Sequence, residues 1–136
     1  MHVVGKTLAG TLALGRMAFG INYAIRPQEA STSWIGPVAK APPVQVIVRS
    51  QGARDIALGA GSLRALVRDD RRELRAWVLG QTLADGTDPL ATWIARRKLP
   101  RRQAKLAMIV AGASTLVGGA AAIALRPEPP SAPRSA

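Results

Sequence analysis

The chain has 136 residues, no cysteine, one histidine and a formal net charge of +11 at pH 7. The missing cysteines exclude disulfides, thiol catalysis and Cys-ligated metal sites, and His2 alone cannot support a His-based metal site or a Ser-His catalytic arrangement. The excess of basic residues fits either nucleic acid or anionic lipid headgroups. Because only 4% of the residues are aromatic and no nucleic-acid motif is present, we favour lipid and expect no nucleic-acid partner.

The first apolar stretch covers residues 3–25 and predicts a helix. It ends at Arg26, because the proline at position 27 disfavours helical backbone in the residue before it. Lys6 followed by apolar residues resembles the start of a secretory signal, but Arg16 interrupts the hydrophobic region. We therefore expect this helix to be retained in the mature protein.

Two further apolar stretches, residues 44–67 and 74–95, follow a segment of different composition. Residues 28–43 are rich in proline, glycine and serine, which predicts an ordered loop, with Trp34 as an anchor at the level of lipid headgroups. The charged run 68–73 separates the two stretches. Each stretch is long enough for a membrane-spanning helix, although each contains ionisable residues.

The fourth stretch, residues 106–125, is the strongest membrane signal in the chain. It contains no charged residue, and at ~1.5 Å per residue it would extend about 30 Å as a helix, the thickness of the hydrocarbon core of a bilayer. Glycine and alanine make one side of it small, as in a helix that packs on other helices in lipid. Six basic residues come before it: Arg96, Arg97, Lys98, Arg101, Arg102 and Lys105.

These stretches predict an all-α protein with a bundle of four transmembrane helices. Residues 1–126 would form the membrane domain, and the proline-rich residues 127–136 a disordered tail. Gly86 and Pro89 leave open a kinked or re-entrant third segment. The main structural alternative is a mixture of spans with a re-entrant or interfacial segment. A soluble bundle is less favoured, because the fourth stretch has no polar face. We expect a multi-pass protein of the inner (plasma) membrane, and its orientation stays open because basic residues near the segment ends divide equally, eight against eight.

Six charged side chains would then lie within the bilayer: Arg16, Arg49, Arg54, Asp55, Asp85 and Asp88. A lone charge at the centre of a membrane helix costs roughly 2.5–3.5 kcal/mol on insertion scales, so these groups cannot face lipid. Three are positive and three negative, which predicts a mutually paired cluster inside the bundle. The cluster could hold the helices in register only. Alternatively, it could bind a polar headgroup, a quinone-like or isoprenoid molecule, or a proton.

Asp85 and Asp88 are three residues apart and share one face of a helix. Paired carboxylates can bind a divalent ion or act as acid and base, but no second pair accompanies them, so we assign no metal site, and the cofactor stays unknown. The favoured function is binding of a small amphipathic ligand or support of a membrane-protein complex. An enzyme acting on a lipid-soluble substrate, with Asp55, Asp85 or Asp88 as acid or base and Arg54 as oxyanion or phosphate partner, is the first alternative. A soluble, basic nucleic-acid-binding protein is the second.

The sequence also resembles a known family through a set of short motifs. They are Gly15-Arg16, Gly20, Pro27, Trp34-Ile35-Gly36, Arg49, the GARDIALG stretch at 52–59, Asp85 and Asp88. Over about residues 8–123 the chain resembles small integral membrane proteins classed as a domain of unknown function, DUF4267, and more loosely DoxX-like membrane proteins. The resemblance implies four membrane helices and no particular activity.

Overall fold

The computed structural model describes residues 2–126, and the expected tail at 127–136 lies outside the described residues. The described chain consists of helices joined by short turns and loops, which confirms the all-α class. Its elements are α1 (His2–Ile25), α2 (Pro27–Ile35), the 3-10 helix η1 (Gly36–Lys40), α3 (Pro42–Val67), α4 (Arg71–Ala95) and α5 (Arg101–Ala124).

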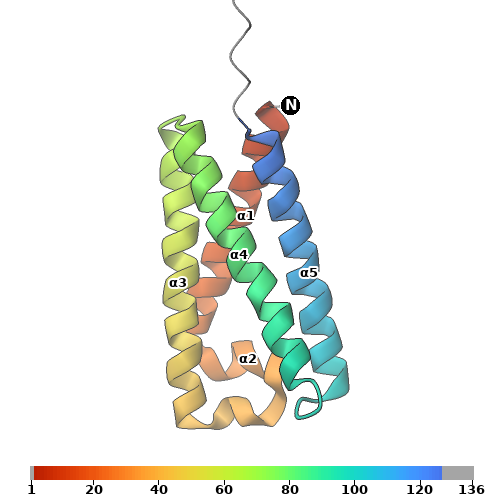
Figure 1. Ribbon diagram of the computed structural model, residues 1–136. Helices are drawn as coiled ribbons and strands as arrows, with labels where there is room; N and C mark the ends of the chain where they lie inside the picture. Colours follow the sequence, from red (N-terminus) through yellow and green to blue (C-terminus); the bar gives the residue numbers. More distant parts are fainter. Residues whose placement is uncertain (1, 127–136) are drawn as a thin grey trace, which may run out of the picture.

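The four long helices run alternately up and down and form a bundle (Figure 1). Around the bundle, α1 packs against α3, α3 against α4, α4 against α5, and α5 against α1. The start of α1, the α3–α4 turn and the end of α5 lie at one end of the bundle. The helix α2 and the α4–α5 loop lie at the other (Figure 1). Because α2 contacts α1, α3 and α5, it covers that second end.

The prediction of an ordered loop at 28–43 is wrong. Residues 28–40 form most of α2 and all of η1, and α3 begins at Pro42. Pro27 starts α2 at a position where its missing N–H costs nothing. Gly36 ends the helix with φ 75°, a conformation that favours glycine. Sequence reasoning missed α2 because it read the prolines as helix breakers, whereas here they start helices. The described residues therefore contain five α-helices instead of four.

The third predicted segment is a single continuous helix and not a re-entrant one. Pro89 lies inside α4, where it removes one backbone hydrogen bond. The helix nevertheless runs to Ala95, because α4 packs along α3 and α5. At its other end, Asp70 caps α4 by accepting a hydrogen bond of 2.8 Å from the backbone N–H of Glu73.

Large apolar side chains lie mainly on the outside of the bundle. Leu74, Val78 and Leu125 are the largest apolar side chains that are fully buried, and the other fully buried positions are mostly alanine. In contrast, exposed large apolar residues occur on all four long helices, for example Leu14, Val46, Leu83 and Leu116. Buried polar groups include Ser62, Gln81 and Asp85. This distribution is the reverse of that in most water-soluble proteins.

Glycines let α1 and α3 approach closely. A Cβ atom on Gly52 would lie 2.6 Å from the carbonyl oxygen of Gly20, and one on Gly59 would lie 2.8 Å from that of Ala13. Since real side chains do not tolerate such distances, the backbones touch at these points. Gly61 likewise lies in close contact with the ring of Trp77 on α4.

The start of α1 is tied to the α3–α4 turn. The Lys6 ammonium donates a hydrogen bond to Asp69, and this contact lowers the pKa of the Asp69 carboxyl group. The start of α1 and the α3–α4 turn lie at the end of the bundle that also contains the end of α5 (Figure 1). Asp69 has φ 55°, a left-handed conformation that aspartate tolerates better than most residues.

Only α5, among the described helices, is apolar and long enough by composition to cross a membrane. Its mean hydropathy over the best window is 1.9. The other long helices carry charged residues that lower their hydropathy.

Candidate functional site

A polar stripe runs along one face of α4. Gln81, Asp85, Asp88 and Thr92 follow one another at intervals of four, three and four residues, the spacing that keeps side chains on one side of a helix. Gln81, Asp85 and Thr92 are buried, and the Asp88 side chain is 25% exposed. The stripe therefore faces the inside of the bundle.

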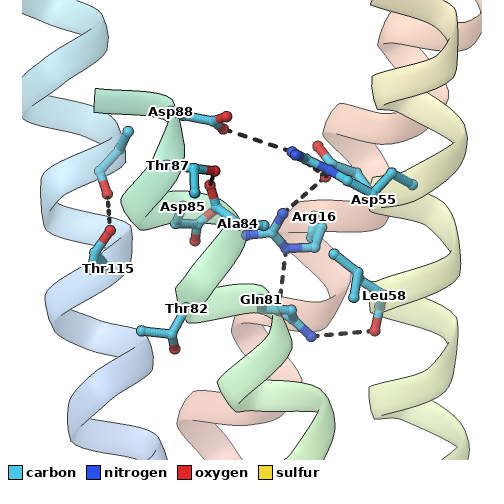
Figure 2. Close-up of polar contacts among 12 residues, drawn as sticks. Arg16, Asp55, Leu58, Gln81, Thr82, Ala84, Asp85, Thr87, Asp88 and Thr115 are labelled. Atoms are coloured by element: carbon cyan, nitrogen blue, oxygen red, sulfur yellow. Dashed lines mark hydrogen bonds and ion pairs between the residues drawn. The ribbon is translucent and has the colours of Figure 1, made fainter. Parts of the chain in front are cut away.

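Arg16 of α1 joins this stripe to α3 (Figure 2). Its Nη1 atom donates to Asp55 Oδ1 at 2.9 Å, its Nη2 atom donates to Asp85 Oδ1, and its Nε atom donates to Gln81 Oε1 at 3.3 Å. The side chains of Arg16 and Asp55 are each 9% exposed. Every nitrogen of this guanidinium thus has a partner, and one arginine ties together three helices.

Gln81 is held in turn by α3. Its Nε2 atom donates to the Leu58 carbonyl oxygen at 3.3 Å and to Ser62 Oγ at 2.5 Å. These two bonds direct the amide oxygen toward Arg16 (Figure 2). The neutral glutamine therefore fixes the orientation of the guanidinium between the two carboxylates.

Arg54 lies at the edge of the cluster. Its Nε and Nη2 atoms donate to Asp55 Oδ1 at 3.2 and 3.1 Å, and its Nη2 atom lies 3.7 Å from Asp88 Oδ2. The Arg54 side chain is 38% exposed. Asp88 consequently has the weakest pairing of the three carboxylates, since its recorded ion pair is this long contact.

Arg49 is not brought into the cluster. It is exposed on α3 and donates through Nε to the Ala24 carbonyl oxygen near the end of α1, at 3.3 Å. Arg49 and Arg54 are five residues apart, which rotates them to different sides of a helix. The cluster that the structure assembles therefore contains two arginines and three aspartates.

A cavity of about 410 Å³ lies beside the cluster. Arg16, Asp55, Asp85 and Asp88 form its polar end, and residues of α1 and α5 form most of its apolar wall. Phe19, Leu106 and Val110 line the cavity and are also 59%, 50% and 58% exposed. Since these residues belong to α1 and α5, the cavity opens between those two helices.

Trp34 of α2 lines the cavity where it approaches the covered end of the bundle. Its Nε1 atom donates to Thr92 Oγ1 at 3.1 Å. The indole thus points toward α4, and the level of Trp34 relative to lipid headgroups stays a prediction. Its position depends on α2, which sequence reasoning did not foresee.

Sequence reasoning also missed Gln81 and Tyr23. Gln81 binds Arg16 directly, and Tyr23 lines the cavity from α1. Gln81 could have been found, because it lies four residues before Asp85 and extends the same polar stripe. Tyr23 carried no comparable signal, since its role depends on how α1 is rotated in the bundle.

The described residues thus form an all-α bundle with a buried Arg/Asp cluster next to a partly open cavity. They include no group of three or more His, Cys, Asp or Glu side chains placed to hold a metal ion. Comparison with protein families matches residues 13–125 to the family described as Domain of unknown function (DUF4267). The chain belongs to this family, which confirms the resemblance. No curated protein and no solved structure matched the chain.

Proposed function

We propose that the protein is a multi-pass protein of the inner (plasma) membrane that binds a small amphipathic molecule in the cavity between α1 and α5. The long helices α1, α3, α4 and α5 contain 24, 26, 25 and 24 residues. At ~1.5 Å per residue each extends at least about 36 Å, enough to cross a hydrocarbon core of ~30 Å.

The distribution of side chains supports the membrane location. Exposed apolar residues surround the bundle, whereas Arg16, Asp55 and Asp85 lie inside it, each with a partner of opposite charge. In a bilayer, the exposed apolar residues would contact lipid tails, which is favourable. Arg16, Asp55 and Asp85 would be kept away from the lipid tails. Arg16 in α1, Asp55 in α3 and Asp85 in α4 lower the hydropathy of their helices although they face the inside of the bundle.

A single observation carries the binding proposal: an apolar cavity that opens at the side of the bundle ends at buried, ordered charges. Its volume of about 410 Å³ falls in the range of ~300–1,000 Å³ typical of small-molecule sites. The mouth would face the bilayer, so that a molecule could enter from the lipid. Its polar head would lie at the charges, and its apolar part would extend out between α1 and α5. An amphipathic ligand matches both ends of the cavity.

Membrane insertion can be tested by extraction and by labelling. The protein should stay with membranes in alkaline carbonate and in high salt. Because the chain has no cysteine, single cysteines can be introduced cleanly. Asp69→Cys in the α3–α4 turn and Lys98→Cys in the α4–α5 loop should react with a membrane-impermeant thiol reagent from opposite sides. Release into the soluble fraction, or labelling of both sites from one side, would overturn the proposed four spans.

Ligand binding can be tested by filling the cavity. Gly15 lines it, and a Cβ atom there meets nothing within 4 Å, so Gly15→Phe should fill the space without disturbing the helices. Gly119→Phe is the matched control, because Gly119 is equally unobstructed and does not line the cavity. Mass spectrometry of molecules co-purified in lipid nanodiscs should detect a species with the parent and the control that is lost from Gly15→Phe. If all three carry the same molecules, the cluster acts as a structural support within a membrane complex and not as a binding site.

A further inference from the structure

The polar end of the cavity is short of positive charge. The cluster contains two guanidinium groups and three carboxylates, which leaves one negative charge in excess. The imbalance is larger at the cavity itself, because Arg54 does not line it whereas all three aspartates do. Arg16 is the sole cationic side chain among the residues that line it.

The partners of Arg16 make the site unfavourable for an anion. Three of its five N–H groups already donate to Asp55, Asp85 and Gln81, and the two carboxylates among these partners outweigh its single positive charge. Asp88 is different, since its recorded ion pair is the 3.7 Å contact with a partly exposed Arg54. A ligand reaching the end of the cavity therefore meets an incompletely paired carboxylate.

Aromatic side chains provide a second, independent indication. Phe19, Tyr23 and Trp34 all line the cavity, which gathers three of the five aromatic residues of the chain in one place. Aromatic faces attract organic cations, and quaternary ammonium ligands are commonly held by aromatic residues. The nearby carboxylate adds attraction for a cation and repels an anion, whereas it offers a neutral headgroup a hydrogen bond only.

We propose that the cavity binds an amphiphile whose head is a singly charged organic cation of the alkylammonium class. The head would pair with Asp88 and contact the aromatic side chains. The alkyl part would lie along Leu106 and Val110 and leave between α1 and α5. This inference rests on the proposed ligand-binding function and adds the charge of the ligand.

The test compares probes that share one alkyl chain and differ in the charge of the head. Decyltrimethylammonium, decyl sulfate and decanol are added to the protein in nanodiscs made of zwitterionic lipid. Binding is followed by Trp34 fluorescence in a Trp77→Phe/Trp93→Phe background, so that the signal comes from the cavity. We expect saturable binding of the cation, with a half-saturating concentration at least tenfold lower than those of the other two probes. Because the protein carries a net charge of +11, non-specific attraction would favour the anion instead.

Variants assign the selectivity to Asp88. Asp88→Asn should weaken cation binding roughly tenfold or more, as expected for loss of a charged partner, and Asp88→Glu should restore much of it. Glu29→Gln is the control, because Glu29 is an exposed carboxylate of α2 that does not line the cavity. Phe19→Leu provides a second measurement that does not depend on the cluster. It should weaken binding of the cation more than binding of the other two probes.

The outcomes separate this inference from the function on which it rests. If the three probes bind equally and Gly15→Phe blocks all of them, the cavity binds ligands but the inference about charge is wrong. If decyl sulfate binds best, or if Asp88→Asn leaves cation binding unchanged, the inference is also wrong. If no probe gives a saturable signal that Gly15→Phe removes, the binding function itself fails.

Discussion

At the level of single residues, Arg16 is the centre of the structure. It bonds Asp55 of α3 together with Asp85 and Gln81 of α4, so three helices depend on one guanidinium. Burying such a charged group carries a desolvation penalty, and its partners offset that penalty only when the cluster is complete. Removing one member should therefore be more harmful than removing a matched pair.

Arg16→Gln should destabilise the protein by roughly 3–5 kcal/mol, because it leaves a buried carboxylate without a counter-charge. The two carboxylates are affected differently. Asp55 keeps its bonds to Arg54, whereas Arg16 is the recorded partner of Asp85. In the Arg16→Gln background, Asp85→Asn should therefore restore more stability than Asp55→Asn. Thermal unfolding in detergent or nanodiscs measures all of these variants.

Arg49→Gln is the control for this series, because Arg49 is exposed and lies outside the cluster. Its effect should stay within about 0.5 kcal/mol, as for most surface substitutions. Equal rescue by Asp55→Asn and Asp85→Asn would contradict the assignment of partners. If Arg49→Gln loses as much stability as Arg16→Gln, the placement of Arg49 outside the cluster is wrong.

At the level of helices, the inner face of α3 is built from small and polar residues. Val48, Gly52, Asp55, Gly59 and Ser62 are buried and repeat at intervals of four and three residues. The glycines bring α1 close enough for Arg16 to reach Asp55, and the same face carries the serine that holds Gln81. The close contact of α1 with α3 thus positions the cluster.

Gly52→Ala should weaken this contact, because the added Cβ atom would lie 2.6 Å from the Gly20 carbonyl oxygen. Overpacking of this kind costs roughly 1–3 kcal/mol. Gly112→Ala makes the same chemical change in α5, where a Cβ atom meets nothing within 4 Å, and should be neutral or slightly stabilising. The two melting temperatures are compared in the same detergent. A similar effect of both variants would mean that α1 and α3 are not in close contact.

The start of α4 depends on its cap. Asp70→Ala should cost about 1 kcal/mol, because it removes the side-chain acceptor for the Glu73 N–H. Asp70→Ser keeps an acceptor at the same position and should retain most of the stability. Hydrogen exchange of the first turn of α4 reports the local effect. An equal loss for serine and alanine would assign the effect to the charge of Asp70 instead of its hydrogen bond.

At the level of the whole molecule, the effect of a substitution at an exposed position depends on whether lipid or water surrounds the bundle. Leu83 is 71% exposed near the middle of α4. If the helix lies in lipid, as we propose, Leu83→Lys should oppose insertion by roughly 2.5–3.5 kcal/mol and lower the amount of membrane-bound protein. In water, the same change at an exposed leucine would be close to neutral.

Val67→Lys is the matched control, because Val67 is 86% exposed but lies at the last residue of α3, where a lysine can reach the headgroups. Quantitative blotting of membrane fractions compares both variants with the parent. Normal amounts of Leu83→Lys in membranes, or a larger loss for Val67→Lys, would contradict the proposed depth of α4.

The sequence by itself determined the all-α class, the family and the approximate extent of the long helices. The predicted ends at residues 25, 67 and 95 coincide with those of α1, α3 and α4, and α5 ends at Ala124, one residue before the predicted end. These features are local, because apolar length, proline positions and charged boundaries act within one segment. The same local reasoning required the charges within these segments to find partners.

Only the tertiary structure decided which charges meet. Helix α2 folds over one end of the bundle and brings Trp34 to Thr92, although its prolines indicated a loop. Arg49 lies outside the cluster, whereas Arg16 has two carboxylates and Gln81 as partners. These outcomes depend on how each helix is rotated about its axis and on how closely the glycines let α1 and α3 approach. Both are set by contacts between residues far apart in the chain, which the periodicity of one segment does not encode.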